Sequence, residues 1–146
     1  MPAHASQSTC NALIRRSIDL RQLYGQAAAA CEPGLRVVLS ENAHTLEMMI
    51  ADLQAQLSAR GSTPCTHGSS SALLRRRLTG CLIRTVARPD NAWIRALMHH
   101  ESALLRAFEH AIEGTSVEAA PVLRRQLPRL RGIHLDMHHL AGSARY

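Results

Sequence analysis

Apolar residues recur at steps of three and four along most of the chain, which is the pattern of one face of an α-helix. Long stretches with this pattern run over roughly 9–30, 35–60, 92–112 and from Thr115 to about 141. Valine and isoleucine do not alternate with polar residues over a useful length, so strands are not expected. The pattern predicts an all-α protein.

The first two stretches have apolar faces without a charged residue. In the first, which Ser8 or Thr9 is expected to cap, the face consists of Leu13, Ser17, Leu20, Tyr24, Ala27 and Cys31. In the second, the spacing is typical of a seam between packed helices, and the face consists of Leu39, Ala43, Leu46, Ile50, Leu53 and Leu57. Pro33 and Gly34 are expected to separate these helices, and Gly61 to end the second.

The last two stretches each have one polar residue within the apolar face. Glu101 fills the gap in the face formed by Leu97, Leu104, Phe108 and Ala111. His134 fills the gap in the face formed by Leu123, Leu127, Leu130, Met137 and Ala141. Gly114 should separate the two helices, and Thr115 with Glu118 forms a capping box for the second. Pro128 lies well inside that helix and predicts a kink there.

About thirty residues connect the two pairs of helices. Residues 61–71 are rich in Gly, Ser, Thr and Pro and predict a loop. Residues 71–87 predict a short amphipathic helix, with Leu74, Leu78, Cys81 and Leu82 on one side. Short loops make each pair antiparallel, and a long link can join opposite ends of a bundle, as in ferritin-like topology.

We therefore predict a single ferritin-like four-helix bundle over residues 9–141, made of two antiparallel helical hairpins joined by a long crossover that contains a short helix. Residues 1–8 are expected to form a disordered tail, and residues 142–146 a frayed one. A chain of 146 residues is long enough to bury one sizeable core.

The amino-acid composition indicates which partners and which cellular compartment to expect. The net charge of +6 comes entirely from arginine, since all 17 basic residues are Arg, and it permits an acidic partner without requiring one. No run of 18 apolar residues and no secretory signal is visible, so we expect a cytoplasmic protein without a membrane partner. The irregular spacing of Cys10, Cys31, Cys65 and Cys81 indicates reduced thiols, not a disulfide frame or a zinc site.

Several short motifs, taken in order, resemble a bacterial ferritin-like family that is catalogued only as a domain of unknown function. They are Asp19 with Tyr24, Ala51-Asp52-Leu53-Gln54 followed by Arg60-Gly61, Glu101 with Ala107-Phe108-Glu109, and Arg125-Gln126-Leu127 with His134. The resemblance covers about residues 11–140. It implies a four-helix bundle that often self-associates, has stress-associated members and has no established catalytic activity. The chain departs from the family at Pro128 and in its many additional histidines.

Tyr24, Glu101 and His134 are predicted to form a buried polar cluster, because each lies within an apolar helix face. A carboxylate buried without a partner would cost several kcal/mol. We therefore expect Glu101 and His134 to satisfy each other or a buried water, with the Tyr24 hydroxyl nearby. On this interpretation the cluster is structural, and no catalytic residue is assigned.

A metal-binding or redox bundle is the first alternative. A di-metal carboxylate site takes a carboxylate from each of two helices and a Glu-x-x-His pair from each of the other two, all facing inward. Glu41 and His44 form such a pair, but they fall opposite the apolar face of their helix, and Arg131 stands three residues before His134. Glu41, His44, Glu101 and His134 would then form an incomplete site for iron, manganese or zinc.

A nucleic-acid binder is the second alternative, because an arginine-rich patch can contact phosphates. The patch consists of Arg75, Arg76, Arg77, Arg84 and Arg88. It lacks interleaved aromatic residues and helix-turn-helix spacing, so a solvated helix face is favoured over nucleic-acid binding.

The chain is best interpreted as a non-catalytic bundle. No serine or cysteine has a histidine at helical spacing on an inward face, and no glycine-rich phosphate loop is present, so a hydrolase is disfavoured. Val37 and Met48 share the outward side of their helix with Glu41 and His44. These exposed apolar residues indicate a surface that a second copy of the chain would cover, so a homo-oligomer is expected.

Overall fold

The structure is a computed structural model that describes residues 2–115 and 120–143. Its helices are α1 (Pro2–Ala30), α2 (Pro33–Ala59), α3 (Ser70–Ile83), α4 (Pro89–Gly114), α5 (Ala120–Arg124) and α6 (Leu127–Ser143). No strand occurs among the described residues, which confirms the predicted all-α class. Within the same residues, none of the helices combines the length and the apolar character needed to cross a membrane.

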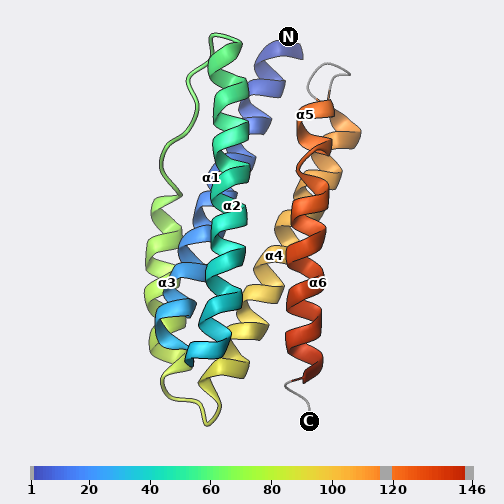
Figure 1. Cartoon of the computed structure of the whole chain (residues 1–146). Helices are drawn as coiled ribbons and strands as arrows, with labels where there is room; N and C mark the ends of the chain where they lie inside the picture. Colours follow the sequence, from blue (N-terminus) through green and yellow to red (C-terminus); the bar gives the residue numbers. More distant parts are fainter. Residues whose placement is uncertain (1, 116–119, 144–146) are drawn as a thin grey trace.

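The long helices α1, α2, α4 and α6 lie side by side along a common direction (Figure 1). α1 packs mainly against α2 and α4 mainly against α6, while contacts of α1 with α4 and of α2 with α6 join the two pairs. The helices of each pair run in opposite directions (Figure 1). α3 lies outside this group, and the segment before it runs along the surface of the bundle (Figure 1). The structure is therefore a helical bundle with one peripheral helix.

The predicted apolar faces of the first helices coincide with the core. Every residue of the predicted α1 face is buried, and α4 buries Leu97, Glu101, Leu104 and Phe108. α2 buries Leu39, Leu46, Ile50, Leu53 and Leu57, and in addition Asn42 and Met49. The hydrophobic spacing therefore located the core of these helices, except that Ala43 and Ala111 are only partly buried.

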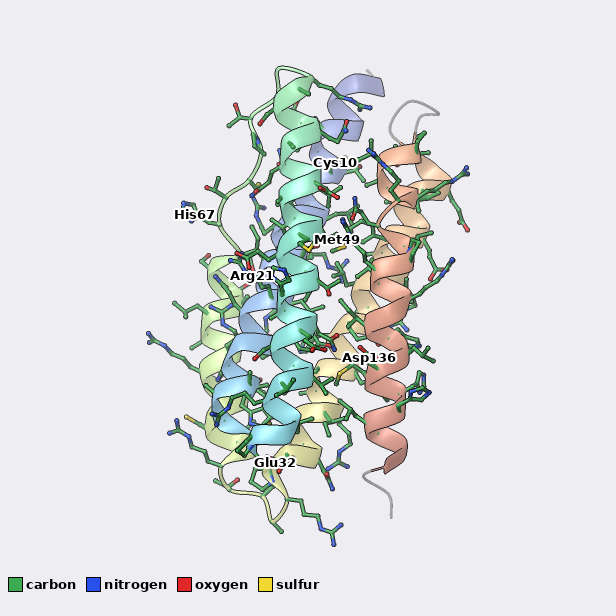
Figure 2. All side chains as sticks on the ribbon, in the orientation of Figure 1. Cys10, Arg21, Glu32, Met49, His67 and Asp136 are labelled. Carbon is green, nitrogen blue, oxygen red and sulfur yellow. The ribbon has the colours of Figure 1, made fainter. Side chains whose placement is uncertain are left out.

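The connection between α1 and α2 differs slightly from the prediction. α1 begins at Pro2, earlier than the expected cap at Ser8 or Thr9. The chain turns at Cys31 and Glu32, where the Glu32 carboxylate accepts a hydrogen bond of 3.2 Å from the backbone N–H of Leu35 (Figure 2). Pro33 occupies the first turn of α2, where its missing N–H costs nothing. Gly61, with φ of +77°, follows α2 as expected, because a residue with positive φ commonly ends a helix.

The prediction of one helix kinked at Pro128 is wrong. The helical stretch is interrupted at Arg125 and Gln126 between α5 and α6, so Pro128 falls in the first turn of α6. An N–H group at that position would have no partner within the helix, so proline is compatible with a helix start. Glu118, the second residue of the predicted capping box, lies outside the described residues.

The residues of the last helix that face the core differ from the predicted set. Ile133 and Gln126 are buried together with Leu123, Leu130 and Met137. Leu127 and Ala141, which were expected in the centre of the face, are only half-buried. The face of α6 is therefore rotated relative to the prediction.

Polar residues on one side of α1 hold the crossover against the bundle. Asn11 accepts a hydrogen bond of 2.8 Å from the backbone N–H of Cys65. The Asp19 carboxylate accepts two hydrogen bonds of 2.9 Å, from the backbone N–H and the hydroxyl of Ser69. Farther along α1, the Gln26 amide donates to the backbone carbonyl of Arg76 at 3.0 Å. These contacts fix where α3 begins and how it lies beside α1.

α3 turns its large apolar side chains away from the bundle. Its buried residues are Ala72, Gly80 and Ile83, two of which are small. The side predicted to be apolar is at the surface, with 62 % of Leu74, 55 % of Leu78 and 69 % of Leu82 exposed. The predicted amphipathic helix therefore exists, but its apolar side faces outward.

An ion pair between α6 and α2 joins the two pairs of helices. Arg129 on α6 donates to Asp52 on α2 at 2.5 Å and to the side-chain carbonyl of Gln126 at 2.8 Å. Arg129 therefore ties α6 to α2 and also contacts the interruption that precedes α6.

The contact between Gly68 and Asp19 predicts that Gly68→Ala is destabilising. An added Cβ would lie 2.1 Å from Asp19 Oδ1, and this carboxylate is held by Ser69. We expect a loss of about 1–3 kcal/mol in the free energy of unfolding, measured by urea denaturation. Gly25→Ala is the control, because a Cβ there meets nothing within 4 Å, and it should stabilise α1 by about 0.5–1 kcal/mol. Equal effects of the two substitutions would contradict the contact.

The Asp52–Arg129 pair predicts a small pH dependence of stability. The hydrogen bond from Arg129 lowers the pKa of Asp52 below its ordinary value of 3.8. Because the folded-state pKa is depressed, the pair stabilises the fold above pH 3.8 and this contribution is lost as the pH falls through the folded-state pKa. Asp52 is half exposed, so the effect should be about 0.5 kcal/mol.

The measurement is urea unfolding of the wild type, Asp52→Asn and Arg129→Gln at neutral pH and in acid. Asp52→Asn should cost stability at neutral pH and nothing once Asp52 is protonated, whereas Arg129→Gln should keep in acid only the cost of its lost hydrogen bond to Gln126. The double variant should lose little more than either single one. A cost that is the same at both pH values would show that the ion pair is not its cause.

Candidate functional site

Each long helix contributes one side chain to a connected group of polar residues in the core, called the polar layer below. Its members are Tyr24 on α1, Asn42 on α2, Glu101 on α4 and His134 on α6. The first three are buried, with Glu101 and Tyr24 at 0 % exposure. The side chain of His134 is 31 % exposed. The polar layer is therefore closed at α1, α2 and α4 and reaches solvent at α6.

The Glu101–His134 contact is the centre of the polar layer. Nδ1 of His134 lies within hydrogen-bond distance of Glu101 Oε1, and the same oxygen accepts a hydrogen bond of 3.1 Å from Ser102. The Ser102 hydroxyl also lies 3.5 Å from His134 Nδ1. In every protonation state that allows the bond, one proton lies between the carboxylate and the imidazole. This arrangement gives a fully buried carboxylate oxygen two polar partners.

Tyr24 lies close enough to Glu101 for the two side chains to interact electrostatically. The Tyr24 hydroxyl and Glu101 Oε2 are both buried, and neither has a direct hydrogen-bond partner among the described residues. Burial raises the pKa of Tyr24 far above its ordinary value, and the charge of Glu101 raises it further, while the nearby Asn42 side chain acts in the opposite direction. The phenol is therefore neutral at physiological pH and can act only as a hydrogen-bonding group, not as a phenolate base.

Asn42 is the member of the polar layer that the sequence analysis missed. Its amide nitrogen contacts the sulfur of Met137 on α6 at 3.8 Å, and the residue is 3 % exposed. Ala43 had been assigned to the apolar face instead. Asn42 lies three residues after Leu39 and four before Leu46, so it fits that face equally well. This spacing was the signal that could have identified it.

His134 lies at the edge of the α6 face and not at its centre. Ile133 occupies the core position, since it fits the spacing between the buried residues Leu130 and Met137. The imidazole consequently reaches the carboxylate of Glu101 from the side of the α4–α6 interface. Its ring also contacts that of His138 edge to face, with centroids 4.6 Å apart.

The four residues of the metal alternative are not brought together. Glu41 and His44 lie on the exposed side of α2, where His44 Nδ1 is 3.9 Å from the carboxylate of Glu47. Glu101 and His134 instead meet between α4 and α6. In residues 2–115 and 120–143, no group of three or more His, Cys, Asp or Glu side chains is placed to hold a metal ion. The polar layer offers one carboxylate and one imidazole.

The arginine patch is divided by α3 and does not form a single surface. Arg75 and Arg76 line a cavity between α3, α1 and α4. Arg77 is exposed beside the outward apolar residues of α3, and Arg84 and Arg88 follow at the end of that helix and the start of α4. The five positive charges therefore point in several directions.

The cysteines are all free thiols. Burial raises the pKa of Cys10, and burial together with the charge and hydrogen bond of Asp90 raises the pKa of Cys31 to about 12. Both buried thiols are therefore protonated at neutral pH, which makes them poor nucleophiles.

In a comparison with known proteins, one region of the chain matches a protein family. A family model described as "Domain of unknown function (DUF2383)" matches residues 6–114. No curated protein matches the chain, and no solved structure matches it. The matched residues include α2 to α4 and nearly all of α1, and thus Tyr24, Asn42 and Glu101, whereas α6 with His134 lies beyond them.

The Glu101–His134 contact predicts strongly non-additive substitutions. His134→Leu should cost about 3 kcal/mol, because it leaves the buried carboxylate without its imidazole partner. The double variant Glu101→Met/His134→Leu should recover most of this loss, because it removes the buried carboxylate together with its imidazole partner. His138→Leu is the control on the same helix and should change stability by less than about 0.5 kcal/mol. Urea unfolding measures all three, and additive costs would contradict the predicted coupling.

Proposed function

We propose that this chain, which belongs to the family described as a domain of unknown function (DUF2383), is a non-catalytic helical bundle that self-associates through α3. The observation that carries the proposal is the row of large apolar side chains on the outward side of α3. We call this row the α3 stripe, and it consists of Leu74, Leu78, Cys81 and Leu82.

The α3 stripe has the features of an interaction surface. Its leucines follow one another at helical spacing and are more than half exposed, and Leu73 and Val86 extend the apolar area at its margins. Contiguous exposed apolar surface of this kind marks contact sites for other proteins. Arg77 flanks the stripe, and no acidic residue occurs between Asp52 and Asp90. Its partner should therefore be apolar and negatively charged.

A second copy of the chain offers such a surface on the outward side of α2. Val37 and Met48 are exposed there. They lie beside the exposed carboxylates of Glu41 and Glu47. An α3-to-α3 contact would instead bring the flanking arginines of two copies together, which is unfavourable. We therefore propose that the α3 stripe of one copy packs on the α2 outer face of the next. Such a heterologous contact builds a closed ring or a filament.

The polar layer supports a structural role. Tyr24, Asn42 and Glu101 are closed off from solvent, Tyr24 is held neutral, and the buried thiols of Cys10 and Cys31 are protonated. We propose that the layer aligns α4 and α6 and performs no chemistry.

The ferritin-like arrangement is part of the same proposal. It is supported by the crossover with α3, which runs from one end of the bundle to the other (Figure 1). The association with stress stays a prediction from the resemblance.

The proposal predicts that polar substitutions in the α3 stripe reduce the oligomer mass. Leu78→Ser/Leu82→Ser removes exposed side chains that contact nothing needed for folding, so the monomer should remain helical while the sedimentation coefficient falls. Leu135→Ser is the matched control, because Leu135 is 56 % exposed but lies on α6. Sedimentation velocity over a range of concentrations measures the mass, and circular dichroism measures helicity.

Charge reversal tests the assignment of the opposite surface. Arg77→Glu and Glu41→Arg should each weaken association, and their combination should restore part of it. A wild-type protein that stays monomeric at every concentration would overturn the proposal. So would a loss of mass in Leu135→Ser that equals the loss in the α3 double variant.

A further inference from the structure

A cavity of about 130 Å³ lies on the inward side of α3, where this helix rests on α1 and α4. Its walls have two chemical characters. Leu20, Leu23 and Leu104 form an apolar part, and Arg16, Arg75 and Arg76 contribute guanidinium groups from two different helices. The cavity is therefore apolar on one side and positively charged on another.

The positive charge of the cavity is only partly neutralised by its own walls. Asp19 is the acidic residue among the lining side chains, and both of its carboxylate oxygens already accept hydrogen bonds from Ser69. Within the described part of the chain, Arg16, Arg75 and Arg76 form no ion pair with a carboxylate. Arg76 Nη1 is moreover buried without a hydrogen-bond partner there. A buried cationic donor of this kind is unfavourable unless an acceptor reaches it.

His100 on α4 shows the same excess of positive charge. It lines the cavity, and its pKa is lowered first by burial and then by the charges of His99 and Arg75. A negative group in the cavity would oppose these two charges. His100 would then act as a further donor beside the arginines.

We propose that this cavity is a binding site for a small organic anion. The acidic group of the ligand, a carboxylate or a phosphate, would pair with Arg16, Arg75 and Arg76, and its apolar body would contact Leu20, Leu23 and Leu104. The volume suits a ligand body of about one ring, since a cavity of roughly 150 Å³ holds benzene. The guanidinium groups favour carboxylate and phosphate because these anions accept paired hydrogen bonds.

The site is independent of self-association through the α3 stripe. The stripe faces outward and the cavity faces inward, so the two surfaces use different residues of α3. An anion in the cavity would link α3 to α1 and α4, which are otherwise connected to it by few polar contacts. Binding per chain and oligomer mass are separate measurements, so either proposal can fail without the other.

The test is calorimetric titration of the full chain with benzoate. Benzyl alcohol has a similar body without the charge, and inorganic phosphate has the charge without the body. We expect benzoate to bind with a stoichiometry of one per chain and more tightly than either. In NMR spectra, the imidazole signals of His100 should shift on addition of benzoate.

Substitutions within the arginine triplet provide matched variants. Arg75→Gln and Arg76→Gln should each weaken benzoate binding about tenfold, because each removes one charge-assisted contact. Arg77→Gln removes the same charge from the same helix but lies outside the cavity, so it should leave the affinity unchanged. Circular dichroism and urea unfolding verify that each variant is folded, and Arg16→Gln on α1 replaces Arg76→Gln if the latter is not.

Three results would overturn the proposal. Benzoate that does not bind would remove the site. An equal loss in Arg77→Gln would show that binding follows net charge and not the cavity. Inorganic phosphate that binds as tightly as benzoate would show that the apolar wall takes no part, so that the ligand is not an organic anion.

Discussion

The alignment of α4 with α6 depends on a carboxylate that is completely removed from solvent. Glu101 needs a polar partner at a fixed position, and His134 and Ser102 provide it. Leucine side chains elsewhere in the interface tolerate small shifts along the helix, whereas a shift of one helical turn, about 5.4 Å, would separate the carboxylate from the imidazole. The polar layer thus specifies a register that aliphatic packing alone leaves open.

α3 determines where arginine and exposed leucine side chains lie on the surface of the bundle. Hydrogen bonds from Ser69 to Asp19 and from Gln26 to the Arg76 carbonyl fix the side on which this helix lies. Its orientation then divides one run of arginines into two groups with different surroundings. Arg75 and Arg76 face a cavity with an apolar wall, and Arg77 lies beside exposed leucines. A single short helix therefore presents the proposed ligand site on one side and the proposed protein contact on the other.

Much of the fold could be predicted from the sequence because helical periodicity is a local property. The faces of α1, α2 and α4 follow from spacing alone, including the burial of Glu101. The direction of the α3 stripe does not, because it depends on contacts with α1 residues fifty positions away. Ile133 occupies the core position that was predicted for His134, because both residues fit the spacing between Leu130 and Met137. Asn42 was missed because two adjacent positions fitted the same face.

The small number of residues that α3 buries also affects the order in which parts of the molecule unfold. This helix buries only Ala72, Gly80 and Ile83 among its described residues, whereas the long helices bury rows of large side chains. Segments with little buried apolar area open at a lower free energy than the remainder of a domain. α3 is therefore the part of the molecule that detaches first, while the remaining helices stay packed. Its backbone amides would exchange with deuterium well before those of α1, and a protease would cut the chain there first.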